Sequence, residues 1–324
     1  MEDYFVIAVD IGGTNYRVAL ADCQGKLVNR RAEPTRSWES PEIGLKRIIE
    51  TIRETGACVD FGQVKGIAVS AAGPLDPERG VMLTPPSLPA WRNVPVKAKI
   101  EEAFHLPVLF ETDTDMAALG EQRFGAARGC SRVIYLTVST GIGGGIIFDN
   151  IILRGANLSV AEIGHMVVDP NGPQCNCGGQ GHLEPLASGT AIARNAAERI
   201  SAGQISSLSV MCNNDLDRIT AEMVVKAASN GDSMASNILE EAGMYLGMAI
   251  TSLIHLLDPE VVIIGGGVAN AGDLILNPIR AAIEERIMPD FRGRARVVRS
   301  ELGDDSGIMG AIALALDEMG NLPR

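Results

Sequence analysis

Residues 5–14 have the sequence Phe-Val-Ile-Ala-Val-Asp-Ile-Gly-Gly-Thr. The apolar, largely β-branched run that leads to Asp10 predicts a buried strand. The pair Gly12 and Gly13 then predicts a tight turn, and residues 16–20 predict a second strand. A glycine loop between two strands differs from the dinucleotide-binding loop, which joins a strand to a helix. It also lacks the Gly-Lys-Ser/Thr sequence of a Walker loop.

The chemistry of this first glycine loop suits phosphate. Gly12 and Gly13 let the backbone come close to a ligand, and their amides and the Thr14 hydroxyl can donate hydrogen bonds to phosphate oxygens. Asp10, at the strand end, can hold Mg²⁺ directly or through water. A plain β-hairpin turn would have the same short pattern, so this loop alone leaves both interpretations open.

Two more glycine loops follow strand-like segments later in the chain. Residues 139–145 are Ser-Thr-Gly-Ile-Gly-Gly-Gly, which is more glycine than a turn requires, and they lie between two expected strands. Residues 265–267 are Gly-Gly-Gly after an apolar strand, at a point where we expect a helix to begin. Three such loops at strand ends indicate a nucleotide that is held from both sides of one cleft.

The same order of expected elements occurs twice along the chain. Strand, glycine turn, two further strands and then helices describe the N-terminal part and again the part that begins near Arg132. We therefore predict an α/β fold of two lobes with related topology and a cleft between them. We place the lobes at residues 1–117 and 118–304, with a last helix at 305–320 that packs back on the first lobe. Helical spacing of apolar residues is present at 41–55, 188–200, 235–257 and 306–319.

Composition and charge exclude several classes of function. The chain has 324 residues, more than one core usually holds, and a net charge of −12, which disfavours nucleic acid and anionic membranes as partners. No uncharged apolar run of 18 residues occurs, and no signal peptide precedes the first strand, so we predict a cytoplasmic protein without a membrane partner. The six cysteines give no disulfide framework in such a chain.

Residues 110–121, Phe-Glu-Thr-Asp-Thr-Asp-Met-Ala-Ala-Leu-Gly-Glu, bring carboxylates from a strand end into a helix. One interpretation is helix capping by the region of Thr112, Asp113 and Thr114, in which we expect Asp113 or Asp115 to serve as a cap. The functional interpretation is that Asp113 accepts the proton of a hydroxyl group during phosphoryl transfer. That reaction needs positioning, charge neutralisation and a carboxylate near the attacking oxygen.

A loop rich in cysteine, histidine and glycine forms the third candidate site. Two of the four histidines of the chain lie beside its only close cysteine pair. The set His165, Cys175, Cys177 and His182 has the composition of a closed tetrahedral structural zinc site, although Cys-x-Cys is tighter than the usual Cys-x₂-Cys spacing. Free thiols and surface histidines in a glycine-rich loop are the alternative. Glu162 and Glu184 flank the cluster, and carboxylates fixed there can accept hydrogen bonds from sugar hydroxyls.

Together these residues resemble the ROK family of sugar kinases, which is part of the actin-like ATPase superfamily. The likeness covers essentially the whole chain. The family motifs match residues 10–14, 73–76, 91–95, 111–121, 140–145, 162–165, 175–184 and 265–267.

The resemblance implies two actin-like (ribonuclease H-like) lobes and an ATP:hexose phosphotransferase that acts on the 6-hydroxyl, glucokinase-like as the first choice, with ATP, Mg²⁺ and structural Zn²⁺. It implies Asp113 as the base. The expected sugar contacts are Gly73, Asn93, Thr112, Asp113, Glu162, His165 and Glu184. The expected nucleotide-binding residues are Asp10, Gly12, Gly13, Thr14, Asn15, Thr140, Gly141, Gly143, Gly144, Gly266 and Gly267. The expected zinc ligands are His165, Cys175, Cys177 and His182.

Three positions depart from the family pattern. Thr112 replaces the usual asparagine before the catalytic aspartate, and a single hydroxyl cannot make the paired contacts of an amide. His182 replaces the usual third zinc cysteine, so we predict a Cys₂His₂ site. Asp115 replaces a common asparagine, and its charge would raise the pKa of the neighbouring base.

Other functions compete with a hexose or N-acetylhexosamine kinase. An N-acetylmannosamine kinase is one alternative, and a sugar-responsive repressor of the same family is another. We expect no repressor, because the first loop begins at residue 10 and leaves no room for a preceding helix-turn-helix domain. A non-catalytic sugar-binding protein or an actin-like filament protein agrees less well with Asp113 and the sugar loop. The sequence does not identify the sugar, and we expect a homodimer or homotetramer from the resemblance.

Overall fold

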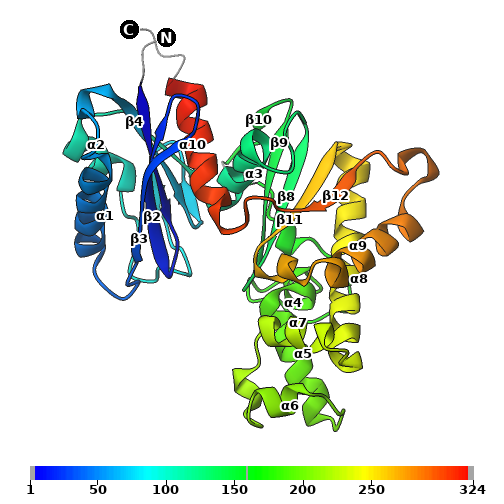
Figure 1. Cartoon of the computed structure of the whole chain (residues 1–324). Helices are drawn as coiled ribbons and strands as arrows, with labels where there is room; N and C mark the ends of the chain where they lie inside the picture. Colours follow the sequence, from blue (N-terminus) through cyan, green and yellow to red (C-terminus); the bar gives the residue numbers. More distant parts are fainter. Residues whose placement is uncertain (1–3, 158–159, 320–324) are drawn as a thin grey trace. The chain divides into compact units, whose positions relative to one another are not determined.

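The computed structural model describes residues 4–157 and 160–319, which divide into two compact α/β units (Figure 1). Unit 1 comprises residues 4–129, 154–157 and 304–319. Unit 2 comprises residues 130–153 and 160–303.

Unit 1 is built on a five-stranded sheet of order β3-β2-β1-β4-β7. Its strands are β1 (Phe5–Ile11), β2 (Asn15–Asp22), β3 (Leu27–Pro34), β4 (Val64–Ala71) and β7 (Val108–Thr112). The first three strands are antiparallel neighbours, whereas β4 pairs parallel with both β1 and β7. The register places Asp10 opposite Arg17. Because β1 and β7 run in the same direction, Asp10 and Asp113, which follow or end these strands, belong to the same edge of the sheet.

Helices cover both faces of this sheet (Figure 1). Along β1, Ile7 and Val9 belong to the core formed with α1 (Pro41–Gly56) and α2 (Val96–Phe104). The alternate residues Val6 and Ala8 belong to the core formed with α10 (Ser306–Met319). This strict alternation of side chains explains why a fully apolar strand is buried on both faces. A short two-stranded sheet of β5 (Leu75–Asp76) and β6 (Val81–Met82) completes the unit.

The last helix packs on the first unit, against α3 (Asp113–Phe124) as well as the sheet. Glycines allow this close approach: a β-carbon on Gly310 would lie 1.7 Å from the Met116 carbonyl oxygen. Unit 1 therefore continues through α3 to residue 129, beyond the expected boundary at 117. Residue 320, the end of the expected helix 305–320, lies outside the described residues.

Unit 2 repeats the topology of unit 1. Its sheet has the order β10-β9-β8-β11-β12, again with three antiparallel strands followed by two parallel ones. The strands are β8 (Val133–Val138), β9 (Ile142–Phe148), β10 (Ile151–Ile152), β11 (Val261–Gly265) and β12 (Arg296–Arg299). The predicted α/β fold with two related topologies is thus confirmed.

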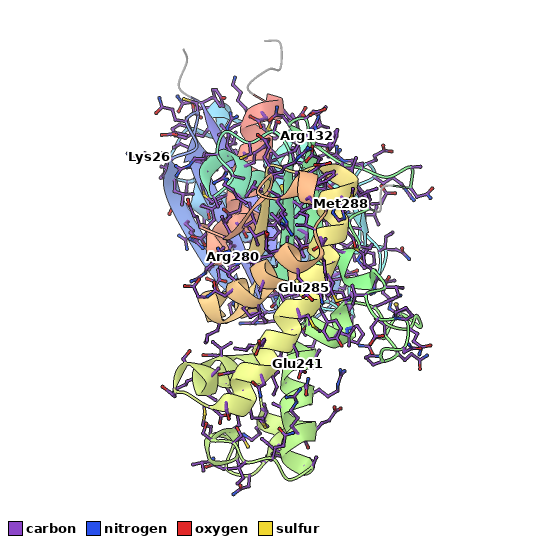
Figure 2. The ribbon with its side chains drawn as sticks, turned by 90° about the vertical axis from the view of Figure 1, so that its right-hand side faces the viewer. Lys26, Arg132, Glu241, Arg280, Glu285 and Met288 are labelled. Carbon is purple, nitrogen blue, oxygen red and sulfur yellow. The ribbon has the colours of Figure 1, made fainter. Side chains whose placement is uncertain are left out.

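The helices of unit 2 enclose one large apolar core. They are α4 (Glu184–Ala187), α5 (Gly189–Ser201), α6 (Leu208–Met211), α7 (Ala221–Ser229), α8 (Ser233–Leu257) and α9 (Asp273–Arg286). Figure 2 shows α8 and α9 side by side, with Glu241 on α8, Arg280 and Glu285 on α9, and Met288 beyond its end. A β-carbon on Gly243 would lie 2.6 Å from Pro278, so small residues permit this contact.

No helix within residues 4–157 and 160–319 combines the length and the apolar character that crossing a membrane requires.

Candidate active site

The first glycine loop is a hydrogen-bonded turn between β1 and β2. The Gly12 amide donates to the Asn15 carbonyl (3.0 Å), so it closes the turn itself. The Thr35 hydroxyl donates to the Gly12 carbonyl (2.7 Å), and the Thr35 amide donates to the Thr14 carbonyl (2.8 Å). Among the described residues the amides of Gly13 and Thr14 have no acceptor, so these two remain to bind an anion.

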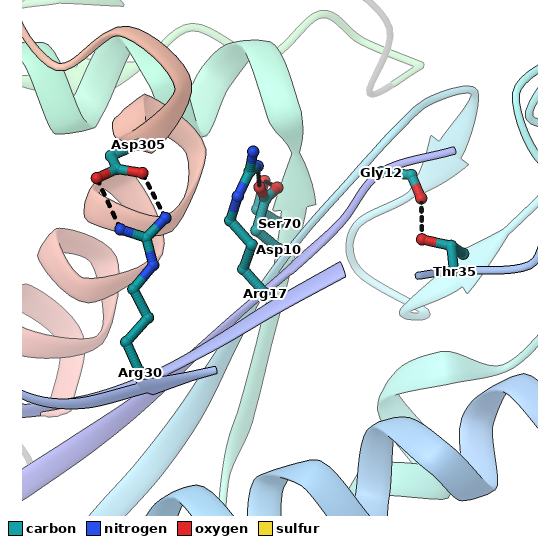
Figure 3. A network of polar contacts seen from close by, with 7 residues as sticks. All are labelled: Asp10, Gly12, Arg17, Arg30, Thr35, Ser70 and Asp305. Carbon is teal, nitrogen blue, oxygen red and sulfur yellow. Dashed lines mark hydrogen bonds and ion pairs between the residues drawn. The ribbon is translucent and has the colours of Figure 1, made fainter. Parts of the chain in front are cut away.

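Asp10 lies beneath this loop in a network of charges (Figure 3). Asp10 is only 8% exposed. Its two carboxylate oxygens accept hydrogen bonds from Ser70 Oγ (3.0 Å) and Arg17 Nη1 (3.0 Å). Desolvation raises the pKa of Asp10, while Ser70 and Arg17 act in the opposite direction. Arg30 and Asp305 form a two-pronged ion pair beside it. Asp10 is therefore a fixed, nearly buried carboxylate of the kind that can hold a hard cation.

Thr112 caps α3, which corrects our expectation that Asp113 or Asp115 would be the cap. The Thr112 hydroxyl accepts from the Asp115 amide (3.2 Å) and donates to Asp115 Oδ2 (2.7 Å). The single hydroxyl proton of Thr112 is thereby used within the helix. The Thr112–Asp115 pair is not a capping box, because the Thr112 amide donates to Glu111 Oε1 (3.3 Å) and not to the Asp115 side chain.

Asp113 is the first residue of α3, and solvent reaches its side chain although a dense shell of protein surrounds the carboxylate. Desolvation by the surrounding protein and, next, the charge of Asp10 raise the pKa of Asp113 to about 7, although amides at the start of α3 oppose the shift. A carboxylate with this pKa is suited to accept a proton near neutral pH.

Asp115 and Glu111 form a second acidic pair at the start of α3. Arg154 Nε donates to Glu111 Oε2 (3.0 Å), and its Nη2 contacts the same oxygen. Desolvation, together with the charge of Glu111, raises the pKa of Asp115 to about 7. The hydrogen bond that Asp115 accepts from the Thr112 hydroxyl opposes this shift. Asp115 Oδ1 is buried without a hydrogen-bond partner among the described atoms.

Gly73 and Asn93 lie on loops of unit 1. Gly73 precedes a cis peptide bond to Pro74, and the nearest atom to a β-carbon built on it would be 3.9 Å away, so the backbone is accessible. Asn93 has a left-handed φ of 53°, which asparagine tolerates, and its amide donates to the Leu83 carbonyl (2.9 Å). Its side chain is exposed and can contact a ligand.

The second glycine loop, in unit 2, is held by hydrogen bonds and by packing, and the Ser139 amide donates to the Gly141 carbonyl (2.9 Å) across its turn. Glu184 Oε2 accepts from the Ile142 amide (2.9 Å), and a β-carbon on Gly141 would lie 2.5 Å from the same oxygen. A β-carbon on Gly144 would lie 2.4 Å from Ile163 Cδ1. Glu184 therefore supports the loop directly, and Gly144 makes space for the segment that carries Glu162 and His165.

That segment contains backbone strain. Ala161 has φ 61°, an unusual conformation for a residue with a β-carbon, immediately before Glu162. Glu162 is exposed and its Oε2 lies 3.9 Å from Nε2 of His165. The unusual conformation of Ala161 thus directly precedes the residue whose carboxylate lies beside the imidazole.

The four predicted metal ligands are gathered in one place. One ligand atom from each of His165, Cys175, Cys177 and His182 lies within 4.8 Å of all the others. Sγ of Cys175 is 3.6 Å from Nδ1 of His165, and Sγ of Cys177 is 3.2 Å from Nδ1 of His182. Burial raises the pKa of the Cys175 thiol, an effect that a bound cation would reverse. The donor set and its spacing fit tetrahedral zinc.

Unit 2 also holds a cavity of about 660 Å³ at the ends of β8 and β11. Its walls are the second and third glycine loops and the first turns of α5 and α7. The lining residues are Ser139, Thr140, Gly189, Thr190, Ala193, Ile219, Thr220, Ala221, Glu222, Val225, Gly267, Val268 and Asn270. Apolar walls suit a purine, while two helix N-termini and a glycine loop suit phosphates.

The third loop begins differently from our expectation. Gly266 has φ 80°, and its β-carbon would lie 2.5 Å from the Val138 carbonyl, so only glycine fits. A short 3₁₀ turn, η4 (Gly267–Ala271), follows in place of the expected helix, and α9 begins only at Asp273. The turn brings Val268 and Asn270 to the cavity wall.

Sequence reasoning missed the arginines and α7. Arg17 is a charged residue within an otherwise apolar strand, a signal that could have identified it. Arg154 gave no such signal, because its partner Glu111 is 43 residues away in sequence. The first turn of α7 lines the cavity with Glu222, and no motif marked it.

Comparison with known proteins agrees with these sites. The sequence pattern of the ROK family matches residues 6–318. A glucokinase of Thermotoga maritima is 36% identical over 315 residues, which cover 97% of this chain and 98% of that protein. A ROK family glucokinase from Streptomyces griseus, solved in complex with glucose and AMPPNP, has a TM-score of 0.81 and 35% identity, over 96% of this chain and 98% of that one.

Repressors also show similarity. The xylose repressor of Bacillus spizizenii is 27% identical over 97% of this chain, but the match covers only 77% of the repressor.

Proposed function

The chain belongs to the ROK family, and we propose that it transfers the terminal phosphoryl group of ATP to a hexose hydroxyl, with Asp113 as the general base. The observation that supports this most strongly is the position of Asp113 at the first turn of α3, with its pKa raised to about 7. The substrate pair bound in the Streptomyces griseus glucokinase, glucose and a non-hydrolysable ATP analogue, is the pair we propose here.

Asp113 would accept the proton of the attacking hydroxyl as the new oxygen–phosphorus bond forms and the bond to the leaving ADP oxygen breaks. Such a base contributes typically about 10²–10⁴-fold to the rate. Thr112 and Asp115 fix the start of α3 and therefore position Asp113. Because the Thr112 proton is used in this cap, we propose that Thr112 contacts the sugar through its methyl group. Gly73, Asn93 and Glu162 remain the proposed polar contacts, with His165.

We propose that the cavity of unit 2 receives the nucleotide. The purine would lie against its apolar walls, and the phosphates would meet the amides of the glycine loop at 140–144. The free amides of Gly13 and Thr14 are the proposed donors from unit 1, with Gly12 and Asn15 forming the turn. Asp10 would hold Mg²⁺, which supplies neutralisation of phosphate charge.

The Cys₂His₂ cluster is proposed as a structural zinc site with His165, Cys175, Cys177 and His182 as ligands. Zinc there would fix the loop that carries Glu184 and orient His165, whose second nitrogen faces Glu162. Metal analysis of the purified protein should give one zinc per chain, and the double substitution Cys175→Ser/Cys177→Ser should abolish it. A zinc content near zero in the unmodified protein would exclude this site.

The first experiment is a coupled assay of ADP release with ATP, Mg²⁺ and a panel of hexoses and N-acetylhexosamines, including glucose, mannose and N-acetylmannosamine. We expect glucose to be the preferred acceptor, because the Thermotoga maritima and Streptomyces griseus relatives are both glucokinases. ADP release that no sugar accelerates would favour the second candidate, a sugar-sensing protein without catalysis, which the similarity to xylose repressors supports.

Two further predictions concern the cellular location and the oligomeric state of the protein. ATP as a substrate supports a cytoplasmic location. Self-association into a dimer or tetramer is supported by exposed apolar side chains of unit 2: Leu256 is 77% exposed and Met288 53% exposed. Sedimentation of the full chain would test this, and substitution of both residues by serine should shift the mass toward the monomer.

A further inference from the structure

The wall of the cavity in unit 2 contains an exposed polar side chain whose amide oxygen is bound by a side chain from β12. Asn270 lies on η4 and lines the cavity. Arg299, the last residue of β12, donates from Nη2 to Oδ1 of Asn270 at 2.5 Å. A guanidinium has only donors, so the amide oxygen must face Arg299 and the amide NH₂ must face elsewhere.

Asn270 and Arg299 are 29 residues apart in sequence, and the fold brings them together. β12 pairs parallel with β11, with Arg299 opposite Ile264, at the edge from which the third glycine loop leaves the sheet. The Ser300 amide donates to the Ile264 carbonyl (2.9 Å) and continues this pairing by one residue. Arg299 is therefore anchored at its backbone beside the turn that carries Asn270.

The other polar side chains of the cavity offer at most one donor each. The Thr190 hydroxyl donates to the Thr140 carbonyl (2.7 Å), so its proton is used, whereas Ser139, Thr140 and Thr220 each carry a single hydroxyl. The Glu222 carboxylate can only accept. Asn270 offers two N–H donors from one amide, beside Gly267 and Val268 on the cavity wall.

We propose that Arg299 and Asn270 form a nucleotide-positioning pair: Arg299 orients the amide so that its NH₂ donates to an acceptor on the adenosine of ATP. This inference rests on the proposed function, because it takes the cavity to be the nucleotide site. Adenosine offers ring nitrogens and ribose oxygens as acceptors, and the apolar walls place this part of ATP beside Val268 and Asn270, with the phosphates toward the glycine loop of Thr140. The pair sets the affinity for the nucleotide and leaves the affinity for the sugar unchanged.

The substitution Asn270→Asp separates this role from a structural one. Aspartate keeps the acceptor for Arg299 and strengthens that contact, but it replaces the NH₂ donors by an oxygen. Adenosine is the appropriate probe because it carries no charge, so a new negative charge does not repel it as it would repel ATP. The measurement is calorimetric titration of the full chain with adenosine and with ADP.

We expect the dissociation constant for adenosine to rise about three- to tenfold in Asn270→Ala, the loss of one ordinary hydrogen bond, and at least as much in Asn270→Asp. Arg299→Leu should match Asn270→Ala, and the double variant should be no worse than either single one, because both act through one contact. Arg294→Leu, which removes an exposed pair with Asp258 away from this cavity, should bind adenosine normally.

Adenosine affinity that is unchanged in Asn270→Asp would overturn the proposal, since it would leave Asn270 only as a structural partner of Arg299. Additive losses in the double variant would overturn it too, because Arg299 would then act on the ligand directly. These outcomes are separate from the proposed function. If the unmodified chain fails to phosphorylate any sugar but Asn270→Asp still weakens adenosine binding, the kinase assignment fails and the positioning pair stands.

Discussion

The first and second glycine loops have similar sequences and are both closed by backbone hydrogen bonds, yet their surroundings differ. The first loop lies above the charges of Asp10 and Arg17, and a β-carbon on Gly13 would lie 2.7 Å from Ser87 Cβ. In the second loop the Ser139 amide donates to the Gly141 carbonyl (2.9 Å), and the loop is packed against Ile163 and supported by Glu184. Glycine in the first loop leaves two amides for a ligand, whereas Gly144 in the second makes space for the segment of Ile163. The same residue type therefore does not imply the same role.

The largest effect should come from the unit that holds the first loop. Asp113→Asn should lower kcat for sugar-dependent ADP release about 10²–10⁴-fold, because an amide cannot accept the hydroxyl proton. The affinity for the sugar, followed by tryptophan fluorescence, should survive. Asp115→Asn is the matched control: asparagine still accepts from the Thr112 hydroxyl, so kcat should change by less than about tenfold. Equal losses in the two variants would contradict the assignment of the base to Asp113.

The second effect tests packing in the second loop. In Gly144→Ala the new β-carbon would lie 2.4 Å from Ile163 Cδ1 and 2.8 Å from the Ala161 carbonyl, so we expect a loss of about 2 kcal/mol in the free energy of unfolding. Gly267→Ala is the control for stability, because no atom lies within 4 Å of its β-carbon position. Urea unfolding of both variants gives the comparison. A Gly144→Ala protein as stable as the original would mean that packing does not hold this loop.

Local patterns predicted the strands and glycine turns well because their causes are local. β1 and the turn at Gly12 follow from apolar runs and glycine, and the repeated order of elements followed from them. A helix was expected directly after Gly267, but α9 begins only at Asp273; its Pro278 disfavours a helix locally, whereas packing against Gly243 of α8 stabilises it. Tertiary contact outweighs local preference there.

The candidate site could be predicted where a motif carries its chemistry, as at Asp113 and the Cys/His cluster. Its supporting residues could not. Arg17 meets Asp10 through strand register, and Arg154 meets Glu111 from a distant loop. The cap of α3 depends on a hydrogen bond from the Thr112 hydroxyl to Asp115. These hydrogen-bond partners are determined by the three-dimensional structure and cannot be read from the spacing of residues in the sequence.

The third effect tests charge beneath the first loop. In the folded protein Arg17 lowers the pKa of Asp10 and so opposes the effect of desolvation. Arg17→Met removes this contribution, so the folded-state pKa of Asp10 should rise further and ionisation of Asp10 should destabilise the folded protein more. A carboxyl whose pKa is raised on folding loses stability as pH rises, so the deficit should be small near pH 4 and reach about 1 kcal/mol at pH 8.

Thermal unfolding of Arg17→Met across this pH range checks the sign. Arg31→Met is the control, because Arg31 and its partner Glu54 are 45% and 59% exposed and such pairs contribute little. A deficit that shrinks toward pH 8 would contradict the proposed role of Arg17.

The smallest effect concerns the strain beside the second loop. Ala161→Gly should raise the free energy of unfolding by about 0.5 kcal/mol, because relief of the left-handed conformation slightly exceeds the extra freedom of glycine in the unfolded chain. Ala197→Gly, within α5, should have the opposite sign. Destabilisation of Ala161→Gly by as much as Ala197→Gly would show that no strain is stored at Ala161.

The central claim is that Asp113 accepts a sugar hydroxyl proton during transfer from ATP, and the pH dependence of kcat for glucose-dependent ADP release tests it most directly. Because desolvation and Asp10 raise the pKa of Asp113 to about 7, activity should fall with a one-proton dependence as pH drops through that value. The residual activity of Asp113→Asn should lack this dependence. A kcat that is constant between about pH 5.5 and 8.5, or ADP release that is the same with and without sugar, would contradict the account.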